Sequence, residues 1–334
     1  MDVKEKLLLR FIEVIKIVQA QTLVGCGIKL IFDNTGGLKG GPAYSMDMDL
    51  DEGKYKVGVA TSFVRDVLEE VIDKSIFKDV SDFIISDTQC SNSATEINEH
   101  IAFSTLALAF LHELGHVING HFLPHDVLQQ GQEERTQKMF DCSAPSWHKT
   151  DFEGADIKEK ITNMQEFDAD CYAGLTLGAW VTFWKLNCPS EELLHKCQRY
   201  IGAVAVQYLY HISWNSGGTP TPDYPPCSVR MMTVLATFTQ HQDAYIKTQK
   251  FPDASLKVDI DLFNQTKAEL TQLQTVTAAC LDKGGYIPIH NIWHNAESWF
   301  PIHEKYHPYI NDYHQLQKEK TKQYQRELIK ACFS

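Results

Sequence analysis

Apolar positions follow strand-like spacing only in the N-terminal part of the chain. Residues 54–60 alternate between polar and apolar side chains, which is typical of a strand with one buried face. Residues 27–33 form a short apolar run that favours another strand, whereas residues 1–21 place apolar side chains at helical spacing. Further expected elements are a helix over 62–72 and a short strand over 83–86. We therefore expect a small sheet with one or two helices in this part.

Beyond this region, apolar residues recur every three or four positions, which predicts helices. Two stretches interrupt the pattern: residues 122–160 are polar and contain proline and glycine, and residues 215–226 are rich in both and must form a loop. The expected helices cover 95–120, 163–186, 191–214, 228–250, 260–281 and 309–331. The pattern as a whole predicts an α+β protein that is mainly α.

These patterns divide the chain into three segments. Residues 1–90 are expected to form a small α/β sheet subdomain that packs on the following helices. Residues 91–250 contain the central helices, with residues 122–160 as an irregular insertion, and residues 251–334 form a C-terminal helical segment. We expect the insertion to roof a cleft as a lid.

Composition restricts the partners and the compartment. The formal net charge of -12 argues against a nucleic acid or an anionic membrane surface as partner, since both attract a surplus of Lys and Arg. The nine cysteines include no CxxC pair, which favours reduced, buried thiols in a cytoplasmic protein over a disulfide framework or a cysteine-based zinc site. The most apolar stretches, 169–186 and 201–214, carry charges or are shorter than the roughly 20 residues of a spanning helix, so we expect no membrane span.

The segment His112-Glu113-Leu114-Gly115-His116 carries the clearest chemical signal. Histidines four positions apart lie on one face of a helix, where both imidazoles can bind the same metal ion. Zinc held by three protein ligands lowers the pKa of a bound water to about 7, and a carboxylate such as that of Glu113 can accept its proton. The apolar run before the motif favours a buried metal-binding helix over a surface helix with two incidental histidines.

A zinc peptidase needs a third protein ligand, and the sequence favours a glutamate. The HExxHxxGxxH pattern fails because Asn119 and Phe122 stand where it requires Gly and His. Glu166 and Asp170 lie four positions apart, on one face of a later helix. We expect Glu166 to complete a site for one Zn²⁺, and Asp170 to accept a hydrogen bond from a zinc-bound histidine, His112. The alternative is an acidic helix start stabilised by the helix dipole.

The HELGH segment followed by Glu166-Phe167-Asp168-Ala169-Asp170 resembles the gluzincin metallopeptidases with an HExxH…ExxxD layout. That family includes the CAAX-processing membrane proteases. The motifs over about residues 105–235 are also similar to those of the soluble phage-exclusion peptidases of the Lit type. The resemblance implies a zincin-like fold and a role in phage defence. It also matches Tyr224 and Arg230 to a His-Pro…Arg element of the active site, with tyrosine in place of histidine.

Three residues are candidates for stabilising an oxyanion: Tyr224, His211 and Arg230. Two of them also have a structural interpretation. His211 lies in an apolar helix, as a core histidine would, and Arg230 could instead form an ion pair with Asp170 or Asp168.

Two further features leave alternatives open. His121 is out of register with the metal-binding face, so we expect it to cap its helix or to line the cleft. The strand over 54–60 could be an exposed edge that pairs with an extended substrate, or an interior strand. Two HxxxH pairs near the C-terminus suggest either a second metal site or an aromatic-rich packing segment: His290, His294, His303 and His307.

Together these observations predict a zinc-dependent endopeptidase that hydrolyses a protein or peptide substrate, with Glu113 as the general base. One alternative is a zinc-stabilised interaction protein without activity, although such a site has no use for Glu113. The other alternative is a membrane-associated processing protease.

Overall fold

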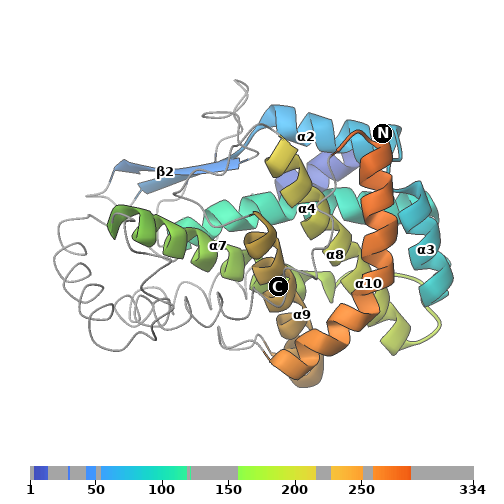
Figure 1. Cartoon of the computed structure of the whole chain (residues 1–334). Coiled ribbons are helices and arrows are strands. Elements are labelled where there is room, and N and C mark those ends of the chain that lie inside the picture. Colours follow the sequence, from blue (N-terminus) through green and yellow to red (C-terminus); the bar gives the residue numbers. More distant parts are fainter. Residues whose placement is uncertain are drawn as a thin grey trace.

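The computed structural model describes residues 4–13, 29–30, 43–49, 54–118, 121, 157–215, 227–250 and 259–286. Within these residues the protein is mainly helical, with a small sheet beside the long central helices (Figure 1). The expected mainly helical architecture with a small N-terminal sheet is confirmed. No described helix combines the length and apolar character that are needed to cross a membrane.

The sheet contains β1 (Lys29–Leu30), β2 (Ala43–Asp49) and β3 (Lys54–Val59) in the order β1-β3-β2. β3 pairs antiparallel with β2 and parallel with β1, so it is the central strand of the described sheet. Its Val57 and Val59 are buried, in agreement with the alternating pattern. The alternative of an exposed edge at β3 is therefore wrong, and β2 is an edge among the described strands.

The N-terminal helices differ from the expected ones in one place. α2 (Thr61–Val67) continues as the π-helix η2 (Leu68–Asp73), close to the expected helix. The short strand expected at 83–86 is wrong, because these residues lie within α3 (Lys78–Thr88). α3 buries side chains four positions apart, Val80 and Ile84, against the core. An apolar run as short as 83–85 fits a strand and one side of a helix equally well.

The remaining helices begin and end within about two residues of the expected positions, except the one expected over 163–186, which begins at residue 157 within the expected insertion and ends at residue 181. α4 (Ala94–Ile118) starts at a capping box, in which Ser93 N donates to Glu96 Oε2 at 2.7 Å and Glu96 N donates to Ser93 Oγ at 3.3 Å. The others are α7 (Ile157–Val181), α8 (Glu191–Asn215), α9 (Cys227–Thr248) and α10 (Ile260–Lys283). The expected helix over 309–331 and most of the insertion 122–160 lie outside the described residues.

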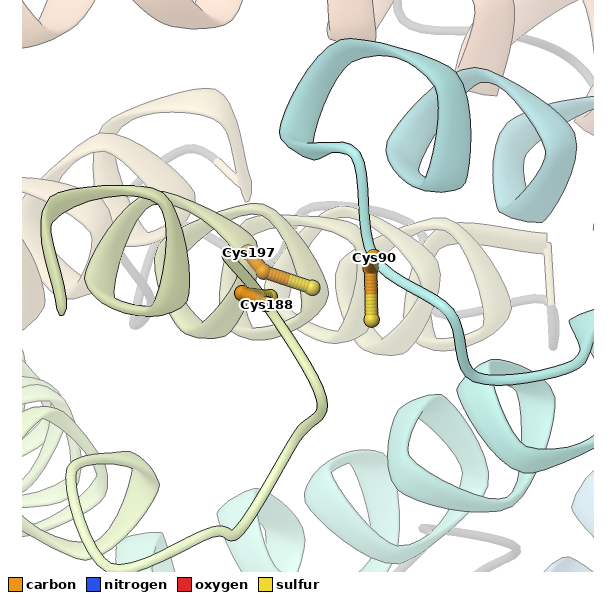
Figure 2. Close-up of side chains that lie close together, drawn as sticks. All are labelled: Cys90, Cys188 and Cys197. Atoms are coloured by element: carbon orange, nitrogen blue, oxygen red, sulfur yellow. The ribbon is translucent and has the colours of Figure 1, made fainter. Parts of the chain in front are cut away.

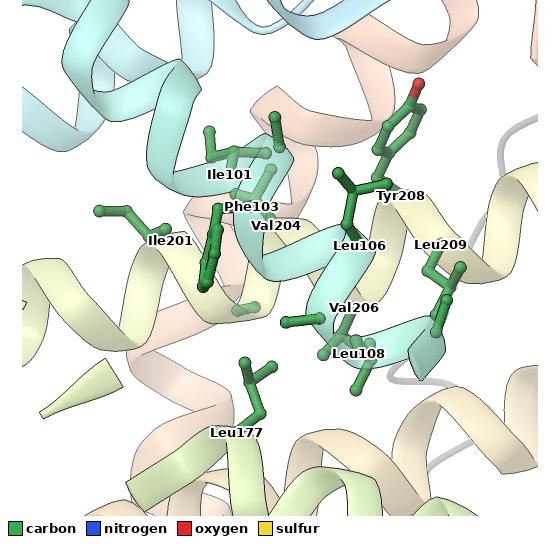
Figure 3. Packing of buried hydrophobic residues seen from close by; sticks show 14 of the residues in the cluster. Ile101, Phe103, Leu106, Leu108, Leu177, Ile201, Val204, Val206, Tyr208 and Leu209 are labelled. Carbon is green, nitrogen blue, oxygen red and sulfur yellow. The ribbon is translucent and has the colours of Figure 1, made fainter. Parts of the chain in front are cut away.

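One apolar core connects the described helices with strand β3. Figure 3 shows its centre, where Ile101, Leu106 and Leu108 of α4 lie between α8 and Leu177 of α7. The same cluster extends from Leu7 to Leu281, so the described parts of the three expected segments share one core. Burial of the α4 face fixes the rotation of this helix, and with it the direction of the polar residues near its end.

Glycines allow α7 to approach α9 closely. A Cβ atom at Gly174 would lie 2.1 Å from Thr237 Oγ1, and one at Gly178 would lie 2.4 Å from the Phe238 carbonyl oxygen. Neither position can accept a side chain without separating the helices. The close contact fixes α7, which carries Glu166, against α9, which carries Arg230.

Candidate metal centre

Two histidines of α4 and one glutamate of α7 converge beside the sheet. His116 Nε2 lies 3.2 Å from His112 Nε2. Oxygens of Glu166 lie 3.3 Å from His112 Nε2 and 3.4 Å from His116 Nε2. The two imidazoles and the carboxylate therefore form a triangle in which each histidine faces a different Glu166 oxygen, and the side chains of Glu166 and His116 are mostly buried.

This triangle has the dimensions of a zinc site. Tetrahedral zinc with bonds of about 2.0–2.2 Å separates neighbouring nitrogen and oxygen ligands by about 3.3–3.5 Å. Both histidines direct Nε2 towards the shared point, and their Nδ1 atoms contact other side chains. The structure thus brings together the three residues that the sequence indicated, in a geometry that can hold a metal ion.

Gly115 explains how α7 comes close enough to supply Glu166. A Cβ atom at Gly115 would lie 3.1 Å from Ala169 Cα and 3.2 Å from a ring carbon of Tyr172. The glycine between the two histidines therefore lets the α7 backbone pass directly over α4. The carboxylate of Glu166 then lies next to both imidazoles.

Asp170 supports His112 from behind. Its Oδ1 lies 2.9 Å from His112 Nδ1, and the Asp170 side chain is fully buried. Tyr210 donates a hydrogen bond of 2.6 Å to the same oxygen. Arg230 binds both carboxylate oxygens, with Nε at 2.8 Å and Nη2 at 3.0 Å. A carboxylate held in this way fixes the ring orientation of the histidine and leaves Nε2 free for a metal.

His116 has a support of its own, which the sequence did not indicate. Its Nδ1 lies 2.7 Å from His121 Nδ1, and His121 Nε2 lies 3.1 Å from Asp168 Oδ2. With His116 bound to a metal through Nε2, its Nδ1–H donates to His121, and His121 Nε2–H donates to Asp168. The backbone N–H of His121 donates to the His116 carbonyl oxygen at 2.9 Å, which agrees with the expected cap of the helix, and its buried side chain adds the contact with Asp168. In the sequence, the position of Asp168 between Glu166 and Asp170 was the signal that could have indicated this contact with His121.

Glu113 lies on the neighbouring face of α4 and is held by the sheet. Ser45 Oγ of β2 donates a hydrogen bond of 2.6 Å to Glu113 Oε2. Burial raises the pKa of Glu113, and the positive charge of His112 opposes this shift. A raised pKa makes the carboxylate a stronger base. The alternation of apolar and polar residues over 43–49 could have indicated this strand, which was not predicted, but no sequence signal pairs Ser45 with Glu113.

The pKa values of the two histidines shift in opposite directions. Burial lowers the pKa of His112, but Asp170 and Glu166 outweigh this effect and raise it to about 10. Burial lowers the pKa of His116 to about 3, against the opposing charge of Glu166. His116 is therefore neutral at pH 7 and offers a lone pair, whereas a metal must displace a proton from His112.

Glu166 remains ionised despite its burial. Burial alone would raise its pKa, but the guanidinium of Arg230 and the two histidines lower it below the usual range. Arg230 Nη2 lies 3.0 Å from Glu166 Oε2 and 3.2 Å from His112 Nε2. The donor set consists of one anionic carboxylate and two imidazoles, which is the set that catalytic zinc sites use.

The three oxyanion candidates have different outcomes. Arg230 forms the ion pair with Asp170 that was one of its two interpretations, and not the pair with Asp168. His211 is fully buried, and its Nδ1 lies 2.6 Å from the Gln207 carbonyl oxygen one turn earlier, which favours a core histidine. Tyr224 and the four C-terminal histidines lie outside the described residues.

No protein-family model, curated protein or solved structure matches this chain, so the interpretation of the site depends on its own geometry.

Proposed function

We propose that the protein is a zinc-dependent endopeptidase whose metal is held by His112, His116 and Glu166. The observation that supports this most directly is the separation of 3.2 Å between the two Nε2 atoms and of 3.3 and 3.4 Å from each of them to a Glu166 oxygen, with Glu113 held by Ser45 on the neighbouring face. A structural zinc site is normally closed by four protein ligands. Three ligands with an adjacent oriented carboxylate are characteristic of a hydrolytic site.

The side chains divide the chemistry between them. A bound zinc ion supplies Lewis acidity, which polarises a peptide carbonyl and makes a water molecule acidic near neutral pH. Glu113 accepts the proton of the attacking water and donates it to the leaving amine. Ser45 keeps the Glu113 carboxylate in one orientation through its hydrogen bond. Arg230, held by Asp170 and Glu166, adds positive charge next to the site.

The sheet provides a place for the substrate. β2 is an edge among the described strands, and its Ser45 contacts Glu113. An extended peptide that pairs with this edge would pass directly over the base, as in β-strand addition. The arrangement of an edge strand, a metal-binding helix and a glutamate-bearing helix supports the zincin-like fold that the gluzincin resemblance implies.

The alternatives are weaker. A zinc-stabilised interaction protein has no need for Glu113 or for the Ser45 hydrogen bond that orients it. A membrane-associated protease would act on a bilayer-embedded substrate, and no described feature favours one. The phage-defence role stays a prediction from the resemblance. Of this role, the site chemistry supports only the cleavage of a protein substrate.

The test compares wild type with Glu113→Gln, which keeps the size and hydrogen bonding of the side chain but removes the base. Each protein is added with zinc to a bacterial lysate, and new fragments are identified by mass spectrometry. We expect discrete wild-type fragments that disappear with a chelator and return with added zinc. Glu113→Gln should retain zinc and lose cleavage by at least about 100-fold. The matched control is Glu192→Gln at an exposed position of α8.

Equal cleavage by wild type and Glu113→Gln would refute the proposed mechanism. Zinc binding without any cleavage by wild type would favour the interaction protein instead.

A further inference from the structure

Three cysteines form a second cluster far from the histidines. Cys90 lies between α3 and α4, Cys188 lies between α7 and α8, and Cys197 lies in the second turn of α8 (Figure 2). Their sulfur atoms all lie within 4.8 Å of one another. The sequence indicated dispersed buried thiols without a cysteine metal site, because no CxxC pair marks this cluster. Folding brings together thiols that are far apart along the chain.

The backbone around the cluster is fixed. Ser91 N donates to the Asn187 carbonyl oxygen at 2.9 Å, and Asn187 N donates to Asn92 Oδ1 at 2.7 Å. Cys90 Sγ lies 3.1 Å from the same Asn92 oxygen. These bonds join the loop before α4 to the loop before α8, so Cys90 and Cys188 are held in place by more than their own packing.

We propose that Cys90, Cys188 and Cys197 bind one thiophilic d¹⁰ cation, Zn(II) or Cu(I), at a structural site. Metal–sulfur bonds of about 2.3 Å separate neighbouring thiolates by about 3.8 Å. Reaching this spacing from at most 4.8 Å requires each sulfur to move by less than about 1 Å, which side-chain rotation can supply. Cys90 and Cys197 are buried, whereas Cys188 is half-buried and gives a metal access from the surface.

Three sulfurs and a shielded position favour a soft metal. Thiolates select Cu(I) and Zn(II) over harder divalent ions, and Cu(I) is satisfied by three sulfur ligands. Zn(II) would complete a tetrahedron with a water on the half-buried Cys188 side. Burial raises the pKa of the Cys188 thiol to about 11. A metal binds the thiolate, so binding at Cys188 releases its proton to solvent.

The location assigns the site a structural role. Cys90 precedes α4, and about 27 Å of that helix separates Ala94 from His112 at 1.5 Å per residue. Cys188 follows α7 and precedes α8. A metal here would join the ends of three helices that position the His112–His116–Glu166 centre. It would stabilise the protein without taking part in hydrolysis.

The experiment uses the full-length, reduced, metal-free protein. Co(II) and Cu(I) are titrated separately, and the thiolate-to-metal charge-transfer absorption is recorded, which a His₂Glu site cannot produce. We expect one equivalent of at least one metal to give this band and to raise the melting temperature. Cys188→Ser, at the half-buried position, should lose both effects. The matched control Cys280→Ser, at a buried thiol outside the cluster, should keep them.

Two further measurements distinguish the cysteine cluster from the histidine centre, and Zn(II) from Cu(I). His112→Ala should keep the charge-transfer band, because the histidine centre contributes no sulfur. Displacement of bound Co(II) by Zn(II) and by Cu(I), each titrated separately, identifies which cation binds more tightly, and either result supports a thiolate site. The proposal is overturned if neither metal gives the band in wild type, or if Cys188→Ser and Cys197→Ser both retain it.

Discussion

Ser45 Oγ donates a hydrogen bond of 2.6 Å to Glu113 Oε2 and thereby connects β2 to α4, the helix that carries His112 and His116. The two residues are 68 positions apart in the sequence. The bond fixes one carboxylate oxygen of Glu113, so that the other can face a water molecule. It also means that the position of the base depends on the sheet as well as on its own helix.

Replacing Ser45 with alanine tests this role. A hydrogen bond to a charged group contributes about 1.5–3 kcal/mol, so we expect Ser45→Ala to lower kcat/KM by roughly 10-fold to 100-fold. Zinc content should not change, because no metal ligand is affected. Ser86→Ala, at an exposed position of α3, is the control. Unchanged kcat/KM in Ser45→Ala would show that the bond does not position the base.

Asp168 is expected to act on the metal through His121 and His116. Asp168→Asn replaces the carboxylate that accepts from His121 Nε2–H by an amide. The hydrogen bonds from Asp168 through His121 to His116 then favour a single imidazole tautomer less strongly. We expect zinc affinity to fall by about 10-fold to 100-fold, measured by competition with a chromogenic chelator. Asp282→Asn at an exposed site should have no effect. A normal affinity in Asp168→Asn would mean that the chain does not tune the site.

Gly178→Ala tests the close packing of α7 against α9. The new Cβ would lie 2.4 Å from the Phe238 carbonyl oxygen, so the helices must separate. We expect a loss of about 1–3 kcal/mol in the free energy of unfolding, measured with urea. Gly284→Ala, whose Cβ would lie 3.3 Å or more from its neighbours, should cost much less. Equal stability of the two variants would contradict the packing described for α7.

His241 should make the protein sensitive to mild acid. Burial lowers its pKa to about 4, and its Nδ1 has no hydrogen-bond partner in the described part of the chain. Because the folded pKa lies below the unfolded value, the unfolded state binds the proton first, and stability falls as pH drops from about 6.5 towards 4. This group accounts for up to about 3 kcal/mol. His241→Leu should flatten the fall in unfolding free energy over that range, and an unchanged slope would contradict the assignment.

Local patterns were sufficient to predict most helices and the residues that form the candidate metal centre. The i, i+4 spacing of His112 and His116 fixes their common face once a helix forms, and the same holds for Glu166 and Asp170. Helix boundaries were marked by caps and by proline- and glycine-rich stretches. These features depend on neighbours in the sequence, which is why the sequence reveals them.

Long-range contacts were not predictable in the same way. β2 alternates apolar and polar side chains from Tyr44 to Asp49, so this strand was predictable, but its Ser45 meets Glu113 only after the sheet packs on α4. His121 lies outside the regular spacing of α4, and only its position next to Asp168 reveals its role. The cysteine cluster combines residues from two loops and one helix. Each of these depends on tertiary packing that no periodicity encodes.

The most direct test of the metal centre is a crystal structure of the zinc-loaded protein with anomalous data collected on both sides of the zinc edge. We predict a zinc peak within about 2.0–2.2 Å of His112 Nε2, His116 Nε2 and a Glu166 oxygen, with Glu113 outside the coordination sphere. Absence of a peak at this position, or a peak coordinated without Glu166, would contradict the proposed centre.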